Sequence, residues 1–275
     1  MSESSTSTHN NQASSQSRIA LSSRGRFALI TVINVLCFMA LWELVARYSG
    51  ISKLFLPPLS SIFADIPKMN AEGILLPNLW VSLKNFAIGL AFGIAVGVPL
   101  GFASGSIRLF DRLISPYLWA LYSMPRIILI PLVFLWVGIN NNARIAIVVI
   151  SVIPQMAVVI MEGVKTTSGT LIRVGRSFGS SRWGLIRHIV LPSSLPYIGT
   201  ALRLGILRGL IGLFVGELFI TANGIGSIIG YARSRFDTAR VFAVLLIFVG
   251  FSVACLVLTR ILESRMSQWR TLPNL

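Results

Sequence analysis

Few side chains in this sequence are of the kinds that enzymes use for covalent or metal chemistry. The chain has two histidines and two cysteines, and no spacing among them is typical of a metal site. No serine or cysteine stands in a recognisable nucleophile motif. Cys37 and Cys255 lie in apolar stretches, where a cysteine usually serves as a small hydrophobic residue. We therefore expect no catalytic residue and no metal, and a membrane enzyme is a weak alternative.

The residues best suited to bind a solute are charged side chains inside otherwise apolar stretches, namely Arg126, Arg208 and Glu217. A charge in hydrocarbon costs about 2.5–3.5 kcal/mol on insertion scales, so each needs a partner, water or a route to the interface. Arg126 or Arg208 could act as a transient counter-charge for an anionic solute, although Arg126 could instead extend to the interface. Glu217 could tie helices together, or it could act at a gate.

Prolines predict a broken helix beside one of these charges. Pro116, Pro125 and Pro131 interrupt an apolar stretch, and each removes a backbone donor and disfavours helix in the preceding residue. Broken helices at membrane depth are tolerated where they line a water-filled cavity. The candidate pathway or gate residues are therefore Met124, Pro125, Arg126, Arg208 and Glu217.

The composition requires an integral membrane protein. Of the 275 residues, 54% are hydrophobic and 12% are charged, and the mean hydropathy is +0.78, outside the usual range of soluble domains. A membrane span needs roughly 20 apolar residues. The apolar stretches lack two-residue alternation, so they predict helices rather than a barrel. The predicted spans are Phe27–Ala46, Leu79–Ser104, Leu113–Gly138, Ala143–Val164, Pro196–Thr221 and Val241–Leu262.

Glycines recur in the second and fifth of these spans. The second has a glycine at every fourth position from Gly89 to Gly105, and the fifth has four between Gly205 and Gly216. Such spacing puts bare backbone along one helical face, where another helix can pack closely. The same smooth faces would also allow helices to slide during alternating access.

Positive charge sets the expected orientation. Lys and Arg are retained on the cytoplasmic side, and they are more numerous in the segments that lie inside when both termini are cytoplasmic. The net charge of +15 then reflects this retention and contact with anionic lipid, not binding of nucleic acid. We expect a disordered cytoplasmic tail over residues 1–25, a transmembrane domain over 26–265 and a cytoplasmic tail over 266–275.

The segment over about residues 165–195 is basic and amphipathic. From Lys165 to His188 it has five Lys and Arg residues and no acidic one, while apolar residues recur at helical spacing. Gly179 can end one short helix in a left-handed conformation, Ser180 or Ser181 can cap a second, and Pro192 is expected to stop that second helix. An apolar stripe on a charged segment needs a protein, or else lipid headgroups, to cover it.

Gly179, nine further residues and then Ile189-Val190-Leu191-Pro192 resemble the cytoplasmic loop of binding-protein-dependent ABC importer permeases, whose motif is Glu-Ala-Ala-x3-Gly-x9-Ile-x-Leu-Pro. The Glu-Ala-Ala positions are Arg173, Val174 and Gly175 here, so the first half of the motif is missing. The stretch Ser123–Gly138 is also similar to the nitrate, sulfonate and taurine branch of these permeases. The residues expected to couple to an ATPase are Gly179, Ser180, Ser181, Arg182, Trp183, Ile189, Leu191 and Pro192.

This resemblance implies an all-α, type I ABC importer permease fold with about six transmembrane helices and a cytoplasmic coupling helix. It implies a homodimer in the inner membrane, served by ABC ATPase subunits and an external solute-binding protein, that imports a small anionic solute by alternating access. The chain lacks any Gly-Lys dipeptide and hence a phosphate-binding Gly-x4-Gly-Lys motif, so ATP and Mg should bind to the partner ATPase. A stand-alone secondary transporter is the alternative, but Glu43 and Glu217 are the only carboxylates well inside spans.

Overall fold

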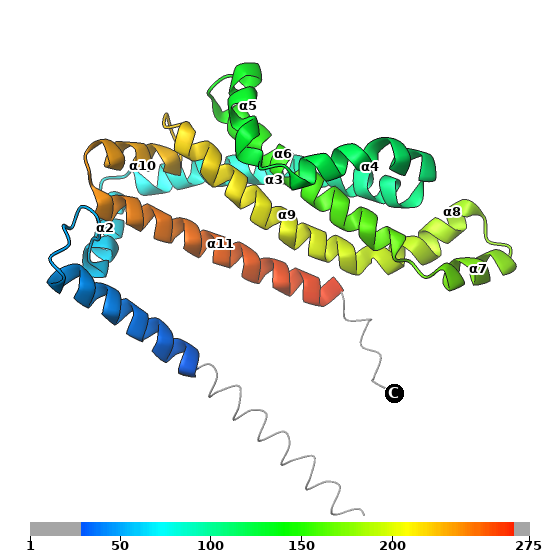
Figure 1. Cartoon of the computed structure of the whole chain (residues 1–275), viewed down its shortest axis with the longest axis horizontal. Helices are drawn as coiled ribbons and strands as arrows, with labels where there is room; N and C mark the ends of the chain where they lie inside the picture. Colours follow the sequence, from blue (N-terminus) through cyan, green and yellow to red (C-terminus); the bar gives the residue numbers. More distant parts are fainter. Residues whose placement is uncertain (1–28, 267–275) are drawn as a thin grey trace, which may run out of the picture. The chain divides into compact units, whose positions relative to one another are not determined.

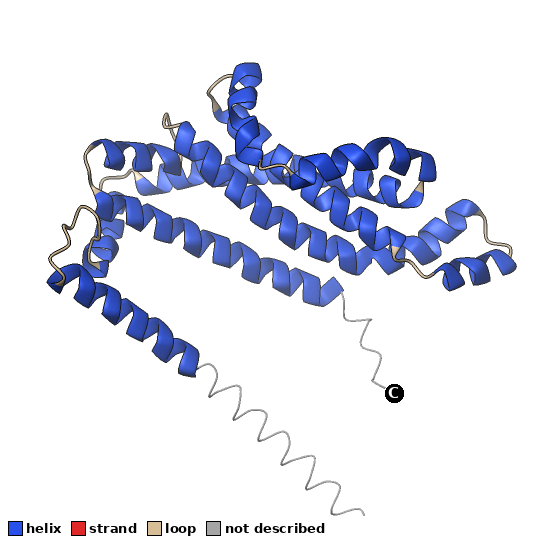
Figure 2. Cartoon of the chain, in the orientation of Figure 1, coloured by secondary structure: helices blue, strands red, loops and turns tan. Residues whose placement is uncertain are grey.

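The computed structural model describes residues 29–266, and their regular structure is entirely helical (Figures 1 and 2). The two predicted tails, 1–25 and most of 266–275, lie outside the described residues. The chain divides into two compact units, residues 1–65 and 66–275. The helices are Leu29–Tyr48, α2 Leu59–Ala71, α3 Leu75–Ser106, α4 Arg108–Ser123, η1 Arg126–Leu129, α5 Ile130–Val137, α6 Asn141–Lys165, α7 Gly169–Ser177, α8 Arg182–Leu185, η2 Ile186–Val190, α9 Leu191–Phe219, α10 Ile225–Ser234 and α11 Thr238–Met266.

The first unit contains one apolar helix, Leu29–Tyr48, which is long enough to span a membrane. Glu43 connects this helix to the start of α2, because its carboxylate accepts hydrogen bonds from the Ser60 hydroxyl at 2.7 Å and from Arg47 Nε at 2.6 Å. Trp42 Nε1 also donates to the Pro57 carbonyl at 3.1 Å. These contacts give Glu43 a structural role in the unit.

Five helices pass a length and hydropathy test for membrane spans, and a bent pair brings the number to as many as six. The bent pair is α4 with η1 and α5, which turn by 100° within the third predicted span. Met124 is extended immediately before Pro125 (φ −71°, ψ 136°), because the proline ring disfavours helical geometry in the residue that precedes it. The predicted break is therefore confirmed, and five of the six predicted spans correspond to single helices, with the bent pair in the place of the sixth.

The core of the second unit is built on α6, which packs between α3 and α9 (Figure 1). The glycines of α3 face α6 at very short range: a Cβ added to Gly101 would lie 2.5 Å from the Ala157 carbonyl oxygen. The glycines of α9 also approach α6 closely, since a Cβ on Gly205 would lie 2.7 Å from Met156 Cγ. Both predicted glycine faces therefore serve close helix packing.

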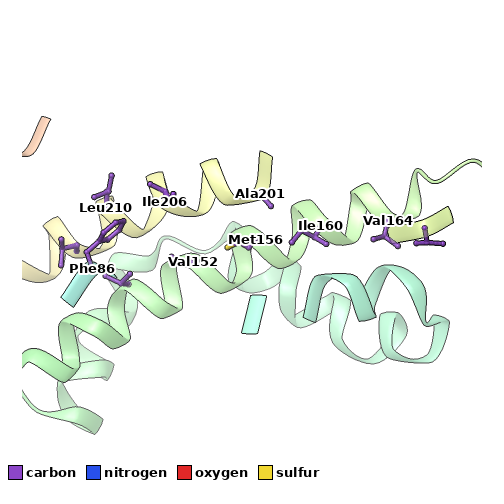
Figure 3. Close-up of a cluster of buried hydrophobic side chains, with 11 residues drawn as sticks. Phe86, Val152, Met156, Ile160, Val164, Ala201, Ile206 and Leu210 are labelled. Atoms are coloured by element: carbon purple, nitrogen blue, oxygen red, sulfur yellow. The ribbon is translucent and has the colours of Figure 1, made fainter. Parts of the chain in front are cut away.

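Apolar side chains fill the space between these three helices. Figure 3 shows Val152, Met156 and Ile160 of α6 among residues from α3 and α9, and all three are fully buried. Interiors packed at this density resist small changes in volume. By contrast, only 11% of the apolar window of α11 is buried in the protein, as expected for a helix that faces lipid. The second unit thus has a dense core that fixes the positions of α6 and α9.

Candidate functional site: a helical hairpin and a cavity between helices

A helical hairpin connects α6 to α9, and Gly179 forms its turn. Gly179 has φ +74°, a left-handed value that residues with a Cβ resist. The Ser180 N–H donates to the Gly175 carbonyl at 3.1 Å, and the Gly179 N–H donates to the Arg176 carbonyl at 2.9 Å. Together these two bonds form a Schellman motif that ends α7. The predicted left-handed cap is confirmed.

Ser181 begins the second helix of the hairpin. Its hydroxyl accepts a hydrogen bond from the Gly184 N–H at 3.1 Å, which satisfies one of the free donors at the helix start. The two helices touch at Gly175, where an added Cβ would lie 2.6 Å from Leu185 and 2.7 Å from Ile189. The Leu185 and Ile189 side chains thus pack directly on the Gly175 backbone, and the hairpin is a packed unit and not two independent helices.

The second helix does not stop at Pro192, so that prediction is wrong. Residues 182–219 form one continuous helix of 38 residues. The five residues of η2 form a π turn in which the Leu191 N–H donates to the Ile186 carbonyl. Proline lacks an N–H and disturbs a regular helix, and a π turn is one way in which a helix absorbs such a break in hydrogen bonding. The hairpin is therefore joined directly to the core helix α9.

A cavity lies where the broken span meets α6 and α9. It has a volume of about 330 Å³, is open on one side, and is lined by Met124, Pro125, Arg126 and Arg208, among other residues. Four of the five candidate pathway residues are thus brought together. Glu217 does not line this cavity. The Nε of Arg208 donates to Gln155 Oε1 of α6 at 3.2 Å, which ties one guanidinium to the core.

The family of the chain follows from its similarity to known proteins. The family model for binding-protein-dependent transport system inner membrane components matches residues 89–268. The chain belongs to this family. The matched residues include the broken span, the cavity, the hairpin and α9, so the chain is a permease subunit of an ABC importer.

This permease is similar to permeases of taurine and sulfonate transport systems. It is 25% identical over 249 residues to the taurine transport system permease protein TauC of Escherichia coli, covering 89% of this chain and 90% of the relative. It is 28% identical over 231 residues to the aliphatic sulfonates permease SsuC of the same organism, covering 84% and 88%. A structure of the MetNI methionine ABC transporter superimposes with a TM-score of 0.62 at 20% identity, over 72% of this chain and 98% of that one. The type I importer permease fold expected from the sequence is confirmed.

The permease departs from the family motif at Arg173, which occupies the position of the motif's glutamate. Arg173 is exposed on α7, and its Nη2 donates to the Thr170 hydroxyl at 3.2 Å. Phe178 and Trp183 flank the turn and are 85% and 70% exposed. Large exposed aromatic side chains on a charged segment are typical of surfaces covered by a protein or by lipid headgroups. The hairpin of this permease thus presents two aromatic anchors with basic neighbours.

We expect Gly179→Ala to destabilise the hairpin turn of the permease by about 1–2 kcal/mol, because an L side chain is disfavoured at a left-handed position. Nothing lies within 4 Å of a Cβ at Gly179, so the cost comes from the backbone alone. Hydrogen exchange at the Ser180 N–H should become faster. Gly184→Ala is the matched control, since an added Cβ there lies 3.4 Å from Ser181 Oγ in a helical residue that favours alanine. Equal exchange rates in the two variants would contradict this role of Gly179.

Glu217 ties helices of the permease together. It is 2% exposed, and its carboxylate accepts hydrogen bonds from the Ser82 hydroxyl of α3 and, at 2.9 Å, from the Gly226 N–H of α10. The Ser82 hydroxyl in turn accepts from the Ile225 N–H at 2.9 Å. Of the two roles that the sequence left open for Glu217, these contacts favour the structural tie.

The sequence analysis did not single out Arg144. Its side chain is fully buried. One Nη donates to the Ile220 carbonyl at 2.9 Å and to the Asn223 carbonyl, and the other donates to Asn141 Oδ1 at 2.7 Å and to the Asn223 side chain. A cationic side chain near the start of an apolar helix needs a polar partner, and this requirement could have drawn attention to Arg144. Arg144 fixes the turn between α9 and α10 onto α6.

Proposed function

We propose that this permease imports a small anionic solute by alternating access, driven by ABC ATPase subunits that bind the Gly179 hairpin. In this proposal the hairpin and both termini are cytoplasmic, as the distribution of Lys and Arg favours. The observation that carries the proposal is the continuity of the hairpin with α9. A surface that would contact the ATPase is thereby joined to a helix that lines the cavity.

The continuity offers a direct mechanical connection. The helix over residues 182–219 has 38 residues and is roughly 57 Å long at 1.5 Å per residue. Arg208 lies on it, so a displacement of Trp183 with a closing ATPase dimer would move one wall of the cavity. Packed helices move as rigid bodies in such transitions. The exposed Phe178 and Trp183 would seat the hairpin in a groove of the ATPase subunit.

The remaining parts of the proposal come from the family and the sequence. We infer that the chain itself binds no cofactor and catalyses no reaction, and that ATP and Mg bind to the ATPase partner. An external solute-binding protein would deliver the solute on the side opposite the hairpin. Two copies of this chain would match a symmetric pair of ATPase subunits. The relatives are named for taurine and aliphatic sulfonates, which supports an anionic solute.

The test is a change to the two aromatic anchors. The permease is expressed together with the ATPase subunit and binding protein of its host, and the purified complex is assayed for ATP hydrolysis. We expect Phe178→Ala combined with Trp183→Ala to abolish co-purification of the ATPase, because central aromatic anchors commonly contribute 2 kcal/mol or more each, roughly 30-fold in affinity.

The matched control is Phe55→Ala combined with Trp80→Ala, which removes aromatic side chains that are 75% and 66% exposed and are not part of the hairpin. This control should retain the ATPase. A complex that survives loss of Phe178 and Trp183 would contradict docking at the hairpin. A permease that purifies alone and takes up solute with a proton gradient would contradict ATP-driven import altogether.

A further inference from the structure

The cavity described above lies close to the middle of the membrane-spanning helices. Ser151 lines it from α6, ten residues or roughly 15 Å from the Asn141 end of that helix. Arg208 lines it from α9, roughly 17 Å from the Phe219 end. A site at this depth is where transporters commonly hold their solute.

The lining of the cavity has an uncompensated positive charge. Arg126 and Arg208 both contribute to it, and no aspartate or glutamate is found among its lining residues. The Nε and one Nη of Arg126 are buried and make no hydrogen bond within the described part of the chain. Arg208 uses its Nε to bind Gln155, which leaves its two terminal nitrogens for a ligand. A pair of guanidinium groups offers several donors in fixed planes, which suits the oxygens of a carboxylate or sulfonate.

Most of the other lining residues are apolar, and Tyr122, Ser123 and Ser151 add hydroxyl groups. Ile127, Ile130, Ile211 and Val215 contribute aliphatic side chains, and Gly212 allows α9 to come close to Ser151 of α6. The volume of about 330 Å³ lies at the small end of the range for ligand pockets, roughly 300–1,000 Å³. The cavity thus combines a cationic wall with room for a short aliphatic chain.

We propose that this cavity is an intramembrane binding site for a compact organic anion, a sulfonate or carboxylate on a short aliphatic chain, held by Arg126 and Arg208. The proposal rests on the proposed import function and assigns the solute class to particular residues. Two arginines without a carboxylate in the same cavity raise the free energy of a membrane protein at this depth. Snorkelling to the interface does not relieve that cost, because the cavity is near the helix midpoints and not at their ends. An anion in the cavity offsets it.

The experiment uses the permease–ATPase complex in nanodiscs of zwitterionic lipid, titrated calorimetrically with methanesulfonate and with dimethyl sulfone, its uncharged analogue. The complex should bind methanesulfonate saturably and dimethyl sulfone not at all. Arg126→Gln and Arg208→Gln should each weaken methanesulfonate binding by at least about tenfold, since each removes a charge-assisted hydrogen bond. The melting temperature of the ligand-free complex should not fall in either variant. Each substitution removes one of two like charges from the cavity and so lowers the free-energy cost of keeping charge away from water.

The matched control is Arg203→Gln, which removes an arginine from the same helix at a position that does not line the cavity. Its affinity for methanesulfonate should match that of the unchanged complex. Unaltered affinity in both Arg126→Gln and Arg208→Gln, or equal binding of dimethyl sulfone, would overturn the site while leaving ATP-driven import untouched. Competition by phosphatidylglycerol in the nanodisc at fixed ionic strength would identify a lipid headgroup as the occupant and would also overturn it. If the unsubstituted complex did not hydrolyse ATP, that result would instead contradict the import function.

Discussion

Gly101→Ala is expected to prevent the permease from folding to a stable form. A Cβ at this position would lie 2.5 Å from the Ala157 carbonyl oxygen and 2.8 Å from Ala157 Cα. Both atoms belong to the backbone of α6, so no side chain can rotate out of the way. Overpacking of a well-packed core costs about 1–3 kcal/mol when side chains can adjust, and we expect a larger loss here. The measurement is the fraction of monodisperse protein that survives heating in detergent.

Two other glycines serve as reference points for the thermal stability of the Gly101→Ala variant. Gly250 lies in α11 with nothing within 4 Å of an added Cβ, so Gly250→Ala should retain or raise thermal stability, as alanine favours helix more than glycine does. Gly97 is intermediate, because the nearest atom to an added Cβ is Met156 Cβ at 3.2 Å. The expected order of stability is Gly250→Ala, then Gly97→Ala, then Gly101→Ala. If Gly101→Ala were as stable as Gly250→Ala, the close contact between α3 and α6 would not exist as described.

The glycine pattern also explains why so much of the fold could be predicted. Hydrophobic length identifies membrane spans, because the bilayer sets the same requirement on every helix. Spacing of four identifies the face along which a helix can pack, and both predicted faces contact α6. The sequence could not say that α6 is their common partner, since α6 itself has no comparable pattern of small residues. Which helices meet is a property of the whole packing arrangement.

The hairpin and the broken span show where local rules succeed and where they fail. Gly179 and Ser181 act through backbone conformation and one hydrogen bond each, so residue type alone predicted the turn. The same local rules failed at Pro192, because a π turn in the preceding residues accommodated the proline. Pro125 had no such turn before it, and the span bends by 100° there. A proline marks a disturbance in the helix, but the neighbouring residues decide whether the helix bends or continues.

Charged residues were located less well than apolar ones. Arg126 and Arg208 were singled out separately, and only the fold brings them to one cavity. Arg144 was missed because it lies one turn inside its helix, where sequence alone does not distinguish a buried cation from one at the membrane interface. Its partners are mainly carbonyl groups and asparagine side chains, which carry no charge pattern that a sequence would reveal.

Arg144→Met is expected to destabilise the permease by about 2–6 kcal/mol, because two buried carbonyl groups lose their donor. The substitution leaves the Ile220 and Asn223 carbonyl groups without the donors that they have in the structure, and each unsatisfied buried group costs about 1–3 kcal/mol. The melting temperature in detergent should fall, and the turn between α9 and α10 should become sensitive to protease. Arg233→Met, which changes an exposed arginine of α10, is the matched control and should leave both properties unchanged.

Glu217 provides a further test of the same arrangement, because Arg144 and Glu217 carry opposite charges at the same end of the core and both act on the turn that follows α9. Glu217→Gln keeps the shape of the side chain but removes its charge, which weakens the bonds from Ser82 and Gly226. If the two residues stabilise the turn together, the double variant Arg144→Met with Glu217→Gln should lose less stability than the sum of the two single losses. Strict additivity would mean that each residue acts alone on its own partners. In that case the turn would be held by two independent anchors, Arg144 from α6 and Glu217 from α9.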